Sequence, residues 1–121
     1  MVGPRPDPSI FEPGSAARQV LERIADRWTA MVVCALATGP KRYGELRRHI
    51  GGITHKMLAQ TLRRMEADGL VSRTILPGKL PGVEYRLTPL GETLIEPLAL
   101  IRAWAEEHFT EIEEARARAN D

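Results

Sequence analysis

The part of the sequence that decides the fold is residues 39–70, which read GPKRYGELRRHIGGITHKMLAQTLRRMEADGL. The glycine and proline that open this stretch end a preceding helix, because glycine adopts the left-handed turn and proline cannot continue a helix. The apolar spacing then predicts a short helix over about residues 43–49, a sharp glycine turn at residues 51–52, and a longer helix over about residues 54–68. Two helices joined in this way are typical of a helix-turn-helix.

The longer helix has a clear start and a clear end. Thr54 is a good N-cap residue, and the apolar pair Ile53 and Leu58 matches a hydrophobic staple, which fixes the angle at which the chain enters the helix. Gly69 ends the helix, and Leu70 can fold back onto its last turn in the Schellman manner. The stripe expected to be buried consists of Leu58, Leu62 and Met65.

Two further helices are expected before this stretch. Ser15 is a suitable N-cap for the first. Its apolar residues recur at helical spacing and are Ala17, Val20, Leu21, Ile24 and Trp28. The second helix, roughly residues 29–37, is apolar on all sides, which predicts a helix buried in the centre of the domain. It contains the single cysteine, Cys34, which we expect to behave as a small buried hydrophobe.

The hydrophobic period changes from helical to two after residue 70. Apolar and charged residues alternate over residues 83–87, and residues 71–76 include several β-branched side chains. Residues 77–82, between these two segments, are bounded by proline and glycine and predict a hairpin loop. The sequence therefore predicts a two-stranded hairpin, which would form the wing of a winged helix-turn-helix.

A last helix follows the hairpin. Thr88 caps it, and the next residue is a proline at the first helical position, where a missing N–H costs nothing. The helix is expected to run over about residues 89–119. Pro97 lies inside it, removes one backbone hydrogen bond, and should bend it.

These elements predict a mostly α-helical domain with a small β-hairpin wing, a winged helix-turn-helix with dimerisation helices at its N- and C-terminal ends. The domain is expected over residues 15–121, and the proline-rich residues 1–14 predict a flexible N-terminal arm. The chain contains no apolar run of membrane-spanning length, and its start lacks the apolar core of a signal peptide. We therefore expect a cytoplasmic protein, with which a single cysteine also agrees.

The net charge of +1 conceals an uneven distribution. Residues 41–73 hold eight basic and three acidic side chains, a net charge of +5, whereas residues 89–121 hold three basic and eight acidic ones, a net charge of −5. A basic centre beside an acidic tail indicates a surface that binds a polyanion. The alternative is a set of solvated helix faces.

The helix over residues 54–68 is the predicted recognition helix, because a helix fits the major groove of DNA. Its expected contact residues are Thr54, His55, Lys56, Gln60, Thr61, Arg63 and Arg64. Glutamine can pair with adenine, and arginine or lysine with guanine. Arg42, Arg73 and Lys79 are further candidates, with Lys79 in the hairpin loop placed to touch the DNA backbone or minor groove. A merely solvated helix face, and charges that only protect a strand edge, are the alternatives.

The sequence resembles the HxlR family of regulators, which is related to the MarR regulators. The resemblance covers roughly residues 15–110 and lies in the segments DRWT (26–29), GPKRYGELRR (39–48), GITHKML (52–58), LRRMEADGLV (62–71) and VEYRLTPLG (83–91). It implies a dimeric bacterial repressor or activator whose DNA contacts come from the helix beginning at Thr54 and from the hairpin loop. Many HxlR-type proteins carry a cysteine just before the first helix that in some senses oxidants or electrophiles. Residues 11–15 here read FEPGS, which argues against sensing by that route.

The last helix also predicts an interface between two copies of the chain. Its apolar residues recur at alternating spacings of three and four, as in a helix packed on another helix, and aromatic residues widen the stripe. The expected interface residues are Val20, Ile24, Leu94, Leu98, Ile101, Trp104, Ala105, Phe109 and Ile112. A homodimer would present two recognition helices to a pseudo-palindromic operator. The alternative is a tail that folds back on its own subunit.

Other functions find less support in the sequence. The three histidines lack metal-ligand spacing and no glycine-rich phosphate loop is present, so we expect no enzyme activity, metal or cofactor. A small-molecule effector remains open, because Trp28, Trp104 and Phe109 could either line a pocket or pack in a core or interface. The second candidate function is a winged-helix module for protein–protein assembly, although such modules usually lack a basic recognition face.

Overall fold

The computed structural model describes residues 12–120, so residues 1–11 of the predicted N-terminal arm lie outside the described part of the chain. In chain order the elements are α1 (Ala16–Ile24), α2 (Arg27–Leu36), β1 (Lys41–Arg42), α3 (Tyr43–His49), α4 (His55–Ala67), β2 (Val71–Leu76), β3 (Gly82–Leu87), α5 (Pro89–Glu92) and α6 (Ile95–Ala119). This order confirms the predicted fold class of helices with a small β-hairpin wing.

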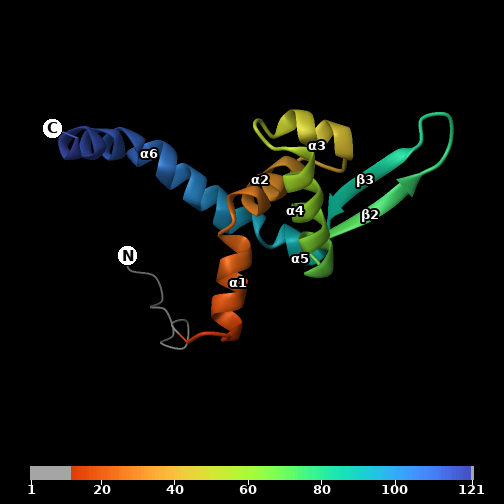
Figure 1. Cartoon of the computed structure of the whole chain (residues 1–121), viewed down its shortest axis with the longest axis horizontal. Helices are drawn as coiled ribbons and strands as arrows, with labels where there is room; N and C mark the ends of the chain where they lie inside the picture. Colours follow the sequence, from red (N-terminus) through yellow and green to blue (C-terminus); the bar gives the residue numbers. More distant parts are fainter. Residues whose placement is uncertain (1–11, 121) are drawn as a thin grey trace.

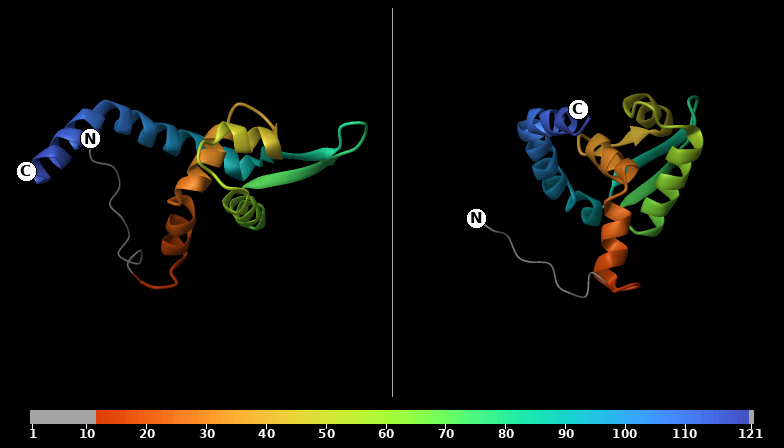
Figure 2. Two further views of the ribbon diagram at one scale, coloured as in Figure 1. Left: turned by 45° about the horizontal axis from the view of Figure 1, so that its top comes forward. Right: turned by 60° about the vertical axis from the view of Figure 1, so that its left-hand side comes forward.

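Three elements project from a central body formed by α2, α3 and α4 (Figure 1). The β2–β3 hairpin extends from one side, the long helix α6 extends from the opposite side, and α1 leaves the body in a third direction (Figures 1 and 2). No helix in the described part of the chain is both long enough and apolar enough to cross a membrane.

Side-chain caps and a glycine turn set the limits of the helices. The Ser15 Oγ accepts a hydrogen bond from the backbone N–H of Arg18 at the start of α1, as predicted. The Thr54 Oγ1 does the same for α4, where it lies 3.1 Å from the N of Met57. At the end of α4, Gly69 has a φ of +76°, a conformation that glycine adopts without a steric penalty. The next N–H then bonds back to the carbonyl of Met65, which confirms the Schellman turn.

The sheet has one strand more than the sequence predicted. The strand order is β1-β3-β2 and both pairings are antiparallel. The hairpin pairs Val71 with Leu87 at its base and Leu76 with Gly82 near its tip. The additional strand, β1, is only two residues long, and such a short segment has no detectable hydrophobic period. It ties the start of α3 to the middle of β3.

The core lies where α2, α3 and α4 meet the base of the hairpin. Its buried apolar residues are Trp28, Val32, Val33, Ala35, Leu36, Leu46, Ile50, Ile53, Leu58, Leu62, Met65, Leu70, Val71, Leu87 and Leu98. The stripe predicted for α4 is therefore confirmed. Because this stripe is fully packed, the opposite face of α4 is held rigidly toward solvent.

The second helix differs from its prediction in two respects. It begins at Arg27, because Asp26 caps it through a 2.8 Å bond from the backbone N–H of Trp28, so Trp28 belongs to α2 and not to the first helix. The expected burial on all sides is also wrong, since Met31 and Cys34 are exposed. The body packs against one side of α2, and among residues 12–120 nothing covers Met31 and Cys34 on the other side.

The final helix is interrupted, and the interruption is not at Pro97. Thr88 caps the short helix α5, which ends at Glu92. Residues 93–94 are not helical, and α6 starts at Ile95. Pro97 consequently lies in the first turn of α6, where backbone N–H groups have no partner within the helix. The sequence predicted a bend within one continuous helix, whereas the structure has a break at residues 93–94. The break lies four residues before Pro97, at the carbonyl for which proline has no N–H donor and with which its ring would clash in a continuous helix.

Candidate nucleic-acid interface

The outward face of α4 carries a row of three polar side chains. Lys56, Gln60 and Arg63 follow one another at spacings of four and three residues, so they lie on one side of the helix. All three are exposed. They form no hydrogen bond or ion pair with the other residues that the structure describes. We call these three residues the reading row, because their donors and acceptors are available to a ligand.

Two predicted contact residues of α4 are engaged elsewhere. The Arg64 Nη2 lies 3.2 Å from the Asp26 Oδ2, which ties α4 to the start of α2 and turns this guanidinium away from the reading row. Thr61 was expected on the outward face, but its side chain is only 1% exposed. It lies three residues after Leu58 and four before Met65, which places it on the buried side of the helix. Its assignment as a DNA contact is therefore wrong.

Replacing Thr61 with valine is expected to stabilise the protein. The Thr61 Oγ1 is buried without a hydrogen-bond partner among the described residues. Valine has nearly the same shape and removes the unsatisfied hydroxyl, so the free energy of unfolding should rise by about 1 kcal/mol. Urea denaturation measures this change. The matched substitution Thr54→Val should instead destabilise by about 1 kcal/mol, because it removes the cap of α4. A loss of stability in Thr61→Val would contradict the expectation.

The wing is attached to the body through Arg42. Its Nη1 donates a 3.0 Å hydrogen bond to the carbonyl oxygen of Leu80 in the hairpin loop. Arg42 therefore positions the loop, although the sequence suggested that it contacts DNA directly. Lys79, next to the anchored residue, is exposed. Arg73 is exposed as well, and its Nε lies 3.6 Å from a carboxylate oxygen of Glu66 on α4.

Tyr85 marks the junction between the wing and the reading row. Burial raises the pKa of its hydroxyl, and the positive charges of Arg73 on β2 and Arg63 on α4 act in the opposite direction. Arg63 on α4 therefore lies close enough to Tyr85 on β3 for its charge to act on the phenol.

The start of α4 holds a cluster of Tyr43, Arg47 and His55, of which only His55 was predicted from the sequence as a site residue. The Nη1 of Arg47, on α3, lies 2.7 Å from the His55 Nε2. The Tyr43 hydroxyl lies 3.1 Å from the His55 Nδ1, and the two rings are stacked. The sequence feature that could have predicted this cluster is the outward position of Arg47 on a short helix next to the glycine turn.

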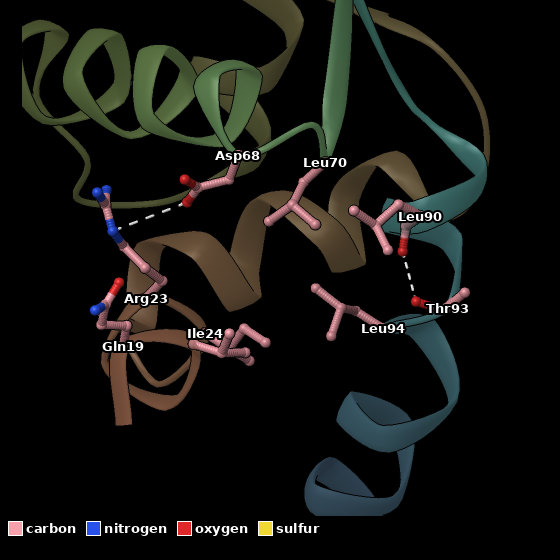
Figure 3. A pocket seen from close by; sticks show the side chains of 9 residues that line it. Gln19, Arg23, Ile24, Asp68, Leu70, Leu90, Thr93 and Leu94 are labelled. Carbon is pink, nitrogen blue, oxygen red and sulfur yellow. Dashed lines mark hydrogen bonds and ion pairs between the residues drawn. The ribbon is translucent and has the colours of Figure 1, made fainter. Parts of the chain in front are cut away.

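A second surface lies between α1, the end of α4 and the segment formed by α5 and residues 93–94. It contains a pocket of about 490 Å³ (Figure 3). The pocket is lined by Gln19, Val20, Arg23, Ile24, Asp68, Leu70, Leu90, Thr93 and Leu94. Ile24 and Leu94 point into it from opposite sides, and the Arg23–Asp68 ion pair, 3.9 Å long, lies at one end (Figure 3).

Three of the predicted interface residues, Val20, Ile24 and Leu94, line this pocket, and the others lie along α6. Ile101 and Trp104 are 63% and 56% exposed, and Val20 and Phe109 are exposed too. Ile24, Leu94, Ala105 and Ile112 are half-buried. Leu98 is different, because it is buried in the core of its own chain, so its assignment to the interface is wrong.

The described part of the chain contains no group of three or more His, Cys, Asp or Glu residues that could hold a metal ion. The reading row and the cluster at the α3–α4 junction are next to each other in the sequence, since Lys56 follows His55. Their chemistry is that of hydrogen-bond donors and positive charge.

The HxlR-like helix-turn-helix family matches residues 23–113 of this sequence. The chain belongs to the HxlR family. The sequence is 40% identical over 104 residues to the HTH-type transcriptional regulator YtfH of Escherichia coli, and the alignment covers 86% of this chain and 82% of YtfH. The matched segment includes the whole of α2–α5 and most of α6.

Solved structures support the same relationship. The transcriptional regulator YtfH from Salmonella typhimurium superposes with a TM-score of 0.81 at 37% identity, covering 89% of this chain and 96% of that one. A MarR-family transcriptional regulator from Porphyromonas gingivalis gives a TM-score of 0.73 at 33% identity, covering 79% of this chain and 94% of that one. This HxlR protein is therefore a DNA-binding transcriptional regulator with a winged helix-turn-helix fold, and a role in protein–protein assembly alone is not favoured.

Proposed function

We propose that a homodimer of this HxlR protein reads a pseudo-palindromic operator, with α4 in the major groove and the hairpin loop on the DNA backbone. The observation that carries this proposal is the reading row, Lys56, Gln60 and Arg63, exposed and free on a helix whose opposite face is fully packed. Such side chains can reach base edges without breaking any contact of the folded protein. Glutamine and arginine have the geometry to select adenine and guanine.

The wing is suited to contact the phosphate backbone of DNA. Lys79 is exposed at the hairpin loop, next to the residue that Arg42 anchors, so its ammonium group can be held at a defined distance from α4. A lysine is a point charge and suits a phosphate better than a base edge. Arg73 is exposed on β2, but its charge is offset by its ion pair with Glu66 on α4.

The second surface supports the dimer. Helix α1 has nine residues and none of them is buried in the single chain. An isolated helix of this length is marginal in water, so α1 requires a partner for its apolar face. The exposed apolar stripe of α6 has the same need and projects away from the body (Figure 1). A second copy of the chain would satisfy both, although the apolar pocket beside α1 also leaves room for a small-molecule effector.

We also infer that the protein acts by binding alone, without catalysis or a cofactor, and that it acts in the cytoplasm, where the bacterial chromosome lies. The relatives that match it are transcriptional regulators. The first test selects bound fragments from genomic DNA and measures their affinity at increasing salt. Neutralising several phosphates releases counterions, so the affinity should fall on the order of 10³-fold between about 50 and 200 mM salt. Failure to retain any duplex fragment at low salt would overturn the proposal.

Substitutions in the reading row should change which sequence is preferred. Gln60→Ala and Arg63→Ala each remove a base contact, which we expect to cost about 1–3 kcal/mol on the operator and much less on unrelated DNA. Lys79→Ala should weaken binding to all sequences about equally. Arg64→Ala is the matched control, since the Arg64 guanidinium pairs with Asp26 and should not affect the preferred sequence.

Binding of wild type and variants to a library of single-base operator variants measures these preferences. If Gln60→Ala lost affinity uniformly while Lys79→Ala changed the preferred bases, the proposed roles of helix and wing would have to be exchanged.

A further inference from the structure

His55 is the first residue of α4 and is held by two side chains of α3. The Nη1 of Arg47 lies 2.7 Å from the His55 Nε2, and the Tyr43 hydroxyl lies 3.1 Å from both the Nδ1 and the carbonyl oxygen of His55. The rings of Tyr43 and His55 are stacked with their centroids 5.7 Å apart. This cluster lies beside the reading row, because Lys56 is the next residue along α4.

These contacts require a neutral imidazole. A guanidinium group can only donate hydrogen bonds, so the His55 Nε2 must accept the bond from Arg47 and cannot carry a proton. The remaining proton is then on Nδ1, which donates to the Tyr43 hydroxyl, and this hydroxyl donates to the carbonyl oxygen of His55. If His55 were protonated, its Nε2–H would face an N–H of Arg47, and its positive charge would lie beside that of the guanidinium.

The cluster borders a hollow of about 300 Å³ with a positive lining. Its walls are formed by Tyr43, Gly44, Arg47, Arg48, Ile53 and His55. The titratable and charged side chains among them are Tyr43, Arg47, Arg48 and His55, and no carboxylate lines the hollow. The nearest acidic residue on α3, Glu45, is occupied by a 2.9 Å bond from the backbone N–H of Arg42.

We propose that this hollow binds a backbone phosphate of the operator, that Arg47 leaves His55 for the phosphate, and that His55 takes up a proton from solvent as it does so. This inference rests on the proposed DNA-binding function and adds that the protein takes up one proton when it binds DNA. In the free protein the His55 Nε2 accepts the hydrogen bond from Arg47 and so has no place for a proton. In the complex Arg47 would instead bond the phosphate, and a protonated Nε2 could donate a second hydrogen bond to the same phosphate.

The sign of the pH dependence follows from the number of bound protons. The DNA complex holds one more proton than the free protein, so acidification favours the complex. One proton can change the affinity by at most about tenfold per pH unit. Between about pH 8 and pH 5, the range in which histidine side chains change charge, we expect the affinity to rise by about threefold to tenfold.

The experiment measures operator affinity against pH at constant ionic strength for wild type, His55→Gln and His49→Gln. His55→Gln should abolish the rise at low pH, because the glutamine carbonyl can accept the bond from Arg47 but cannot gain a proton. His49→Gln is the matched control on α3 and should retain the rise. A circular-dichroism melt of each variant verifies that it is folded.

A second pair of variants tests the phosphate contact without changing pH. Arg47→Gln should reduce the slope of log affinity against log salt by about 0.9, the value for one phosphate. Arg47→Lys retains the charge and should retain most of the slope.

The outcomes separate this inference from the function on which it rests. Operator binding that is independent of pH in wild type, or a pH dependence that disappears in His49→Gln and persists in His55→Gln, overturns the role of His55. An unchanged salt slope in Arg47→Gln overturns the phosphate site. Absence of DNA binding at every pH would instead overturn the proposed function.

Discussion

Replacing Gly91 with alanine is expected to lower the free energy of unfolding by about 3 kcal/mol or more. Gly91 is buried in α5, and a Cβ at this position would lie 2.1 Å from the carbonyl oxygen of Leu70 and 3.1 Å from the Cδ2 of Leu87. The carbonyl cannot easily move, because it accepts a 3.0 Å hydrogen bond from the N–H of Thr88. The whole connection between the recognition helix and α6 would have to shift.

The direction of this effect distinguishes the close contact from simple helix propensity. Alanine is the better helix former by about 1 kcal/mol, so propensity alone predicts that Gly91→Ala stabilises α5. Gly51→Ala is the matched control, since a Cβ there has no atom within 4 Å. Urea unfolding of both variants beside wild type measures the difference. Equal or greater stability of Gly91→Ala would show that the Leu70 carbonyl yields readily.

The sequence could not distinguish this glycine from an ordinary helical one. Caps and turns depend on a few neighbouring residues, which is why Ser15, Thr54 and Gly69 were placed correctly. The contact of Gly91 with Leu70 joins segments that come together only in the folded chain, and no local pattern encodes it. The break at residues 93–94 was predicted only as a bend, although Pro97 lies four residues after Thr93 and its ring would clash with the Thr93 carbonyl in a continuous helix.

The site was predictable to the extent that helical geometry decides it. The spacing of Lys56, Gln60 and Arg63 places them opposite the buried stripe, and all three are exposed. The same geometry should have excluded Thr61, which its polar character made attractive. Arg64 lies at the edge of the outward face, and only the fold brings Asp26 close enough to bind it.

The exposure of Cys34 could not be predicted from the sequence for a different reason. An apolar helix indicates that something covers it, but the pattern cannot specify whether the cover comes from the same chain or from another copy. In the single chain the body covers one side of α2 and leaves Met31 and Cys34 exposed. The same ambiguity applies to the apolar stripe of α6.

Substituting both Ile101 and Trp104 with glutamate is expected to convert the proposed dimer into a folded monomer. These side chains are 63% and 56% exposed in the single chain and lie outside its core, so the DNA-binding body should remain folded. Four carboxylates placed at an apolar interface would each require burial of an unpaired charge, which is strongly unfavourable. Light scattering at micromolar concentration measures the change in mass.

The loss of the dimer should also weaken DNA binding strongly. Two linked recognition helices bind a two-fold operator with an advantage of about 10²–10⁴ over one, because the second contact is intramolecular. We therefore expect the affinity of the double variant for the full operator to fall at least about 100-fold, while its affinity for an isolated half-site stays near that of wild type. Arg102→Ala is the control on the same helix, since its ion pair with Glu106 is solvent-exposed and contributes little. A double variant that still scatters as a dimer would place the interface elsewhere, and a monomer that keeps full operator affinity would mean that one recognition helix suffices.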